Sequence, residues 1–151
     1  MADAFSEIAK SLETLEKDVQ NFLASPDVKK TLQEFMAKSA NTRVYPLYFP
    51  EEYVRRLESG GLGDEQNYEV SVNGNLITVS NETSGNANYS NSEGWDPGYI
   101  NDIIEKGVGY HWSESKIYGY QPYPRPFMEK GVDDFVDIYL LDEIRKRFFE
   151  K

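Results

Sequence analysis

The chain has 151 residues and no cysteine, and its 26 acidic and 16 basic residues give a formal net charge of −10 at pH 7. The absence of cysteine excludes disulfides and thiolate metal sites, and the acidic balance argues against a nucleic-acid-binding protein, because phosphate contacts require an excess of Lys and Arg. The length predicts one domain over residues 1–151, and no apolar run is long enough to predict a membrane span or a membrane partner.

The first part of that domain, residues 1–40, predicts two amphipathic helices. In the first, over residues 3–24, an apolar residue recurs every three or four positions, which places the set on one stripe of a helix. The stripe consists of Phe5, Ile8, Leu12, Leu15, Val19 and Phe22. Core packing is the simplest interpretation of this stripe, and contact of part of it with a neighbouring subunit is the alternative.

Ser25 and Pro26 mark the boundary between the two helices. Pro26 cannot continue the first helix but is favoured in the first turn of the second, where Ser25 is the predicted N-cap. The second helix is expected to run to about Lys38. The apolar face predicted for its core packing consists of Val28, Leu32, Phe35 and Met36.

Residues 41–125 predict a sheet, loops and short helices. A short helix that includes Tyr53 is expected after Pro50 and before the glycine pair at 60–61. Residues 67–80 alternate in polarity and predict a β-hairpin, with Asn73-Gly74 as the turn. A long polar loop over 81–96, a short helix over 97–107 and an aromatic-rich loop or strand over 108–125 complete this part.

The third part of the domain, residues 126–151, predicts one long helix over 126–149. Its predicted buried side consists of Phe127, Phe135, Ile138, Leu141, Ile144 and Phe148. Together these elements predict an α+β fold, in which N-terminal helices and a long C-terminal helix pack on a small, mostly antiparallel sheet.

The residues do not form a recognisable catalytic or metal-binding motif. His111 is the sole histidine, and no serine stands in a nucleophile elbow that it could serve. The glycine pairs lack the context of a phosphate loop, and the paired carboxylates lack a calcium-loop pattern. No catalytic, cofactor-binding or metal-ligating residue is therefore predicted, and the protein is not expected to be an enzyme. Two alternatives stay open, namely a small acidic binding or regulatory domain and a hydrolase that uses Glu105 or Asp102 with His111.

The order of features resembles the neck and tail-completion proteins of long-tailed bacteriophages, the broad family that includes the lambda minor tail protein Z type. Residues 53–62, YVRRLESGGL, and 67–70, NYEV, are similar to the approach to the first strand in relatives from phages of Gram-positive hosts. Residues 103–107, IIEKG, resemble that family's helix end, although Lys106 replaces the usual aromatic residue. Residues 125–128, RPFM, resemble the segment that opens the family's final helix.

The resemblance implies a structural virion protein in the neck, assembled in the bacterial host cytoplasm. Such a protein forms a ring, commonly of six subunits, which completes the tail and joins it to the head around the DNA channel. Its partners are further copies of itself and the neighbouring neck, head-completion, tail-tube and terminator proteins, and DNA passes without specific binding. A tail terminator ring is the nearest alternative.

Aromatic and cationic residues in the middle of the chain are the candidates for contacts between subunits, because aromatic residues and arginine are enriched in interface cores. The candidate subunit-interface residues are Tyr53, Arg55, Arg56, Trp95, Tyr110, His111, Trp112, Tyr118, Tyr120, Tyr123 and Phe127.

Overall fold

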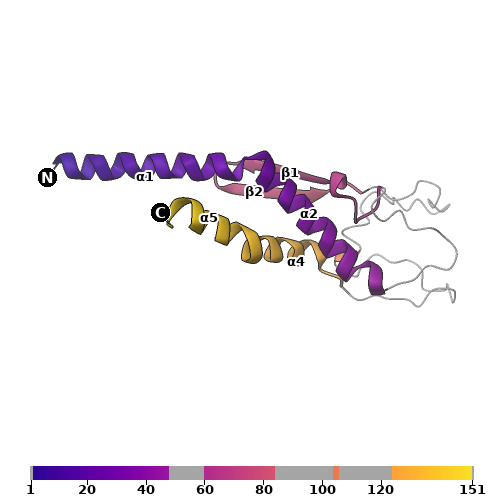
Figure 1. Cartoon of the computed structure of the whole chain (residues 1–151). Helices are drawn as coiled ribbons and strands as arrows, with labels where there is room; N and C mark the ends of the chain where they lie inside the picture. The colour runs from indigo at the N-terminus through magenta and orange to yellow at the C-terminus, as the bar shows by residue number, and fades with distance from the viewer. Residues whose placement is uncertain (1, 48–59, 84–103, 106–123, 151) are drawn as a thin grey trace, which may run out of the picture.

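The computed structural model describes residues 2–47, 60–83, 104–105 and 124–150. The described elements are α1 (Ala2–Leu23), α2 (Pro26–Arg43), the 3-10 turns η1 (Tyr45–Leu47) and η2 (Glu65–Asn67), β1 (Tyr68–Asn73), β2 (Leu76–Asn81), α4 (Phe127–Asp134), the π-helical segment η5 (Phe135–Leu140) and α5 (Leu141–Phe148). The predicted α+β class is confirmed, with terminal helices and, among the described residues, one two-stranded antiparallel sheet (Figure 1). The short helix expected around Tyr53 and most of the one expected over 97–107 lie outside these residues.

Helix α2 lies at the centre of the core, between the hairpin and α4 (Figure 1). It begins as the sequence predicts, because the Ser25 hydroxyl accepts a hydrogen bond from the Val28 amide at 3.4 Å and Pro26 occupies the first turn. It ends at Arg43, one turn beyond the expected end. The core packing predicted for its face is confirmed: the buried residues are Val28, Leu32, Met36, Ala37, Ser39 and Ala40.

Helix α4 approaches α2 closely, and a glycine makes this possible. A Cβ atom at Gly131 would lie 2.8 Å from the Met36 sulfur and 3.1 Å from the Ser39 Cβ. Phe127, at the start of α4, has a fully buried side chain, and its carbonyl oxygen accepts a hydrogen bond from the Ser39 hydroxyl at 2.7 Å. The two helices are therefore joined by close backbone packing and by a buried polar contact.

The hairpin covers the other side of α2. Its pairing runs from Tyr68 opposite Asn81 to Asn73 opposite Leu76, so Gly74 and Asn75 form the turn. The predicted turn dipeptide is therefore wrong by one residue, because Asn73 is still paired in β1, whereas Gly74 takes the positive φ of 59°. The side-chain amide of Gln33 on α2 donates to the Tyr68 carbonyl at 2.6 Å and fixes the hairpin on the helix.

The C-terminal helix departs from a regular α-helix over η5. A π-helix closes its hydrogen bonds one residue later than an α-helix, so the residues that follow rotate relative to the α-helical pattern. Phe135 is buried, as predicted, but Ile138 and Leu141 are 66% and 57% exposed, so their predicted burial is wrong. The residues of η5 and α5 that pack against the core instead are Val136, Tyr139, Leu140, Ile144 and Phe148.

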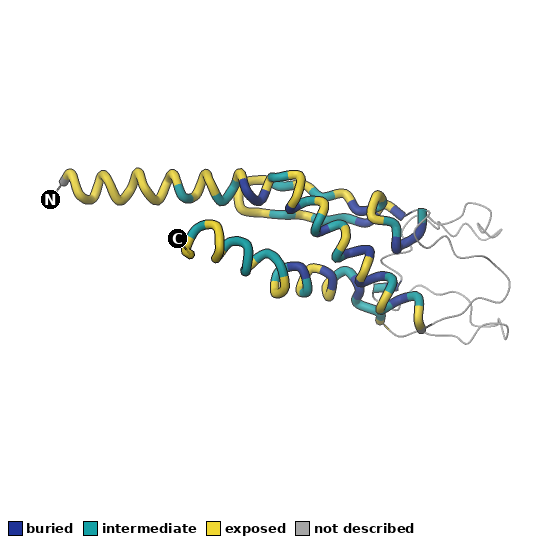
Figure 2. The backbone as a smooth tube through the Cα atoms, in the orientation of Figure 1, coloured by how far each residue is buried: buried dark blue, intermediate teal, exposed yellow. Residues whose placement is uncertain are grey.

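Helix α1 projects from the body as an arm (Figures 1 and 2). The second half of its stripe packs on the core, where Val19 is partly buried and Phe22 is buried. The first half does not, because Phe5, Ile8 and Leu12 are 71%, 57% and 61% exposed. Core packing is thus the wrong interpretation for the first half of the stripe.

Candidate interaction surfaces

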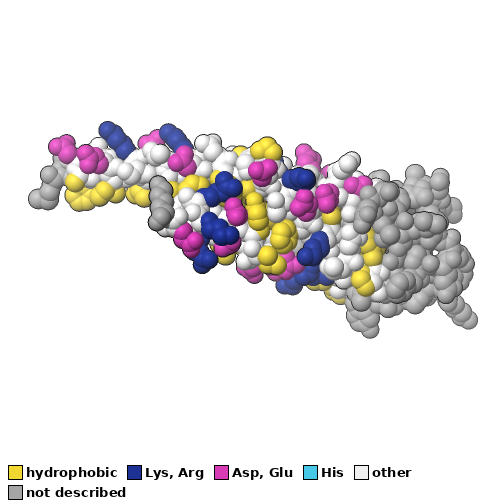
Figure 3. All heavy atoms as spheres, in the orientation of Figure 1, with side chains coloured by type: hydrophobic (Ala, Val, Ile, Leu, Met, Phe, Trp, Pro, Cys, Tyr) yellow, Lys and Arg dark blue, Asp and Glu magenta, His cyan; other side chains and the backbone are white. Residues whose placement is uncertain are grey.

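Three exposed apolar residues lie along one side of the arm, and we call Phe5, Ile8 and Leu12 the arm stripe. Figure 3 shows hydrophobic side chains gathered along the side of α1 that faces the end of α5. The positions beside the stripe carry the small side chains of Ala4, Ala9 and Ser11, and Glu16 lies one turn beyond Leu12 on the same side. The charged residues of this half, Asp3, Glu7, Lys10 and Glu13, fall on the remaining helix surface.

Local interactions give the arm little independent stability. The Glu13 and Lys17 side chains form an ion pair at 2.8 Å, with both side chains about two-thirds exposed. Such a pair contributes only about 0.3–0.5 kcal/mol. The arm stripe is therefore an exposed apolar surface that gains free energy when another surface covers it.

Among the described residues, the cover of α1 ends with α5. The Phe148 ring packs edge-on against the Phe22 ring, with 6.1 Å between the ring centroids. The Arg147 guanidinium lies over the same Phe22 ring, 4.5 Å from its centroid. Because α5 ends at Phe148, it covers the last turn of α1 and leaves the arm stripe bare.

A second exposed apolar surface lies on η5 and α5, and we call Ile138 and Leu141 the outer patch. They line a shallow surface hollow of about 410 Å³ whose other lining residues are Asp137, Asp142 and Arg145. Asp142 bonds to Lys146, and this hydrogen bond lowers the pKa of the Asp142 carboxyl and raises the pKa of the Lys146 ammonium. Two apolar and three charged side chains therefore line the hollow, and two of the charged ones, Asp142 and Arg145, form an ion pair with each other.

The π-helical segment creates the outer patch. In η5 the side chains of Tyr139 and Leu140 pack toward the core, while Ile138 before them and Leu141 after them face solvent. One helix thus carries an inner apolar face for its own chain and an outer one that its own chain leaves uncovered. The sequence prediction missed this patch, because an unbroken α-helical period assigns both residues to the core.

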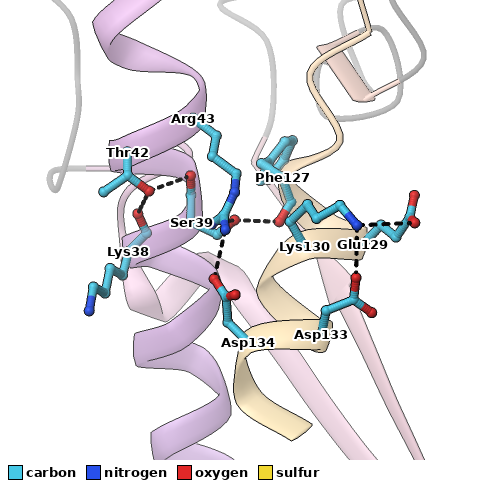
Figure 4. Close-up of polar contacts among 9 residues, drawn as sticks. All are labelled: Lys38, Ser39, Thr42, Arg43, Phe127, Glu129, Lys130, Asp133 and Asp134. Carbon is cyan, nitrogen blue, oxygen red and sulfur yellow. Dashed lines mark hydrogen bonds and ion pairs between the residues drawn. The ribbon is translucent and has the colours of Figure 1, made fainter. Parts of the chain in front are cut away.

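A polar junction fixes α4 on α2 (Figure 4). Arg43 donates to the Ser39 hydroxyl at 3.0 Å and to the Asp134 carboxylate at 2.8 Å, and Ser39 donates in turn to the Phe127 carbonyl. Both partners of the ion pair are about one-third exposed, so the charge interaction is screened by solvent. The junction holds the helix that carries the outer patch in one position on the core.

Glu105 strengthens the same junction from a distant part of the chain. Its two carboxylate oxygens accept hydrogen bonds from the Met128 and Glu129 amides at 2.9 and 3.1 Å. These amides belong to the first turn of α4, so they have no acceptor within the helix itself, and Pro126 at the N-cap supplies no side-chain acceptor. The Glu105 carboxylate, a candidate in the alternative hydrolase hypothesis, therefore caps a helix in this structure.

Of the predicted interface residues, Phe127 alone lies within the described part of the chain. It is fully buried against its own chain, which fits an anchor at the start of the last helix and leaves no surface for a neighbour. The other ten predicted residues lie outside the described residues: Tyr53, Arg55, Arg56, Trp95, Tyr110, His111, Trp112, Tyr118, Tyr120 and Tyr123.

The described residues thus form a small α+β fold that leaves two apolar surfaces exposed, the arm stripe and the outer patch. The sequence model of the YomN family matches residues 4–149, so the chain belongs to the YomN family. This family is phage-derived, of the SPbeta-like prophage type, and the chain is therefore a phage-associated protein. No curated protein and no solved structure matches the chain. Among the described residues, no helix is both long and apolar enough to cross a membrane.

Proposed function

We propose that this protein is a structural subunit of the phage neck. In this role it forms a ring, six-membered by resemblance to the tail-completion proteins, which completes the tail and joins it to the head. The arm stripe is the observation that carries the proposal, because a projecting helix with three bare apolar residues requires a partner surface. Membership of a phage-derived family supports a partner within the phage particle.

A ring is favoured because the chain has two different uncovered surfaces. A cyclic assembly with more than two copies is held by contacts in which one patch meets a different patch on the neighbour. The arm stripe and the outer patch lie on different elements, α1 and η5–α5, and neither is used by the chain's own core. We assign no catalytic activity to the protein in this role.

The net charge of −10 suits a ring around a DNA channel. DNA phosphates are repelled by a negative wall over about one Debye length, roughly 8 Å at physiological salt, so DNA would pass without binding. The proposed partners are further copies of the chain and the neighbouring neck, head-completion, tail-tube and terminator proteins. The proposed location is the neck of the virion, after assembly in the cytoplasm of the bacterial host.

Deletion of the gene from the prophage tests this role directly. After induction, electron microscopy is expected to show DNA-filled heads and separate tails of normal length, and a plasmid copy of the gene should restore joined particles. A plasmid copy with Leu12→Asp should fail to restore them, while a copy with Lys10→Asp, on the opposite side of the arm, should succeed.

The same micrographs distinguish the alternatives. Tails of uncontrolled length would identify a tail terminator ring, because a terminator stops the growth of the tail tube. Normal, infectious particles from the deletion strain would contradict a neck role and favour an acidic binding or regulatory domain. An antibody against the chain should label the junction of head and tail in wild-type particles.

A further inference from the structure

We propose that the arm stripe of one copy docks on the outer patch of the next copy, so that each subunit contributes a different surface to two contacts. This contact rests on the proposed ring, and it names the two surfaces that hold the ring together. The partner is a second copy of this chain, because the buried end of the same α1 face already packs on α5 of its own chain.

The packing of α1 on its own chain shows the kind of partner that the stripe accepts. The last apolar position of α1, Phe22, packs against Phe148 of α5. The arm stripe continues the same face of α1 toward the N-terminus with the same spacing. A second α5, supplied by a neighbouring copy, would extend this helix-on-helix packing along the arm, with the outer patch in place of the inner face.

The two surfaces also match in form. Phe5 and Ile8 are three residues apart on an α-helix, which places them on neighbouring turns of one face, and Ile138 and Leu141 line one hollow. Ridges formed by such pairs can pack into the grooves of a second helix. The hollow of about 410 Å³ over the outer patch gives the protruding arm side chains a place to enter.

Charge favours this pairing over a pairing of two outer patches. Two outer patches face to face would bury the charged side chains of Asp137, Asp142 and Arg145 from both copies in one contact. The arm stripe instead places three apolar side chains, with Ala4, Ala9 and Ser11 beside them, against these groups, and the nearest charge on its side of α1 is Glu16, one turn beyond Leu12. A membrane surface is a poorer partner, because the polar side of the arm carries Asp3, Glu7 and Glu13 with Lys10 and is not rich in cations.

The proposed contact involves one helical face on each copy and is therefore small. Stable two-protein interfaces bury at least about 1,200 Å² in total, so an isolated pair joined in this way is weak. A closed ring uses both surfaces of every copy. Closure therefore stabilises the assembly more than a single contact does, and the cross-linked products should extend beyond dimers.

Cross-linking of the purified full-length chain tests the contact, and the absence of native cysteine makes the chemistry specific. The double variant Ile8→Cys with Leu141→Cys, treated at high concentration with a short bis-maleimide reagent, should give a ladder of dimers, trimers and larger species. The two single variants should not cross-link alone, and their equimolar mixture should give dimers only. Addition of Leu12→Asp to the double variant should lower the cross-linked yield at least about 10-fold, because a carboxylate would be buried in the contact without a partner.

The matched control is Lys10→Cys with Leu141→Cys, because Lys10 is equally accessible on α1 but lies on the opposite side from the stripe. A ladder of equal strength in this control, or no ladder in the test variant, overturns the proposal. Self-cross-linking of Ile8→Cys alone also overturns it, in favour of stripe-to-stripe pairing. Binding to vesicles of phosphatidylcholine and phosphatidylglycerol that is lost in Leu12→Asp, without any ladder, overturns it in favour of a membrane partner.

The contact and the neck role can fail separately. A ladder from the purified chain, together with normal particles from the deletion strain, would support the contact and reject the neck. Unjoined heads and tails in the deletion strain, together with an absent ladder, would support the neck and reject this pair of surfaces.

Discussion

Helices α1 and α2 carry similar apolar patterns and differ in what covers them. On α2, Val28, Leu32 and Met36 are at most 2% exposed, whereas on α1 the residues Phe5 and Leu12 are 71% and 61% exposed. Periodicity identifies the apolar face of a helix, but neighbouring elements decide whether that face is buried. The hairpin and α4 cover α2, while α5 ends at the last turn of α1. We infer from this difference that the uncovered face of α1 is available to a second molecule, as proposed above.

Paired truncations of two phenylalanines should show the largest difference between the covered and uncovered regions. Phe127→Ala should destabilise the fold by about 3–5 kcal/mol, because the fully buried ring leaves a cavity between α2 and α4. Phe5→Ala removes the same group from the arm and should change the stability by less than about 0.5 kcal/mol. Chemical unfolding followed by circular dichroism at low protein concentration measures both values.

The low concentration matters, because it removes any stabilisation that self-association would add at Phe5. A large loss of stability from Phe5→Ala under these conditions would mean that the chain's own core covers the arm. A small loss from Phe127→Ala would mean that α4 is not packed on α2 as the structure shows.

Local signals in the sequence predicted much of the fold. The Ser25 cap, the proline start of α2 and the two amphipathic faces each depend on residues close in the chain, and all are present in the structure. The hairpin is also present, with its turn moved by one residue to Gly74 and Asn75.

Features that depend on distant residues could not be predicted in this way. No local motif in the sequence marks the π-helical turn that exposes Ile138 and Leu141. Burial of the apolar face of α1 ends near Phe22, because α5 stops there. The point at which α5 stops along α1 is set by tertiary packing and not by local sequence. The candidate interaction surfaces are therefore the part of the molecule for which the sequence pattern was least informative.

The pH dependence of stability in alkali tests whether water is excluded from the Tyr68 hydroxyl, where the hairpin packs on α2. Burial raises the pKa of the Tyr68 hydroxyl well above 10, and this hydroxyl donates to the Leu62 carbonyl at 2.6 Å. Above about pH 10 the unfolded state releases the Tyr68 proton while the folded state retains it, so the unfolded state binds fewer protons and stability falls as pH rises. The expected slope is up to about 1.4 kcal/mol per pH unit until the pH reaches the folded-state pKa.

Two variants isolate this contribution in unfolding curves measured at intervals between pH 9 and 11.5. Tyr68→Phe should flatten the slope and lower the stability at neutral pH, because the Leu62 carbonyl loses its donor. Tyr139→Phe makes the same chemical change on η5 and should leave the slope in place, because Tyr68 is still present. An unchanged slope in Tyr68→Phe would show that water reaches this hydroxyl in the folded protein.

The smallest expected effect lies at the boundary between the covered and uncovered parts of α1. Arg147→Ala removes the guanidinium that lies over the Phe22 ring and forms an ion pair with Glu143 at 3.2 Å, and it should cost about 0.5–1 kcal/mol, mostly from the ring contact. Arg145→Ala is the matched control, because Arg145 has ion pairs with Asp142 and Glu150 and is 66% exposed, and it should cost less. Because salt screens ion pairs more than contact with a ring, unfolding in 1 M NaCl should reduce the Arg145 effect and preserve most of the Arg147 effect. Equal losses that both vanish in salt would show that charge alone, rather than packing on Phe22, holds the base of the arm against α5.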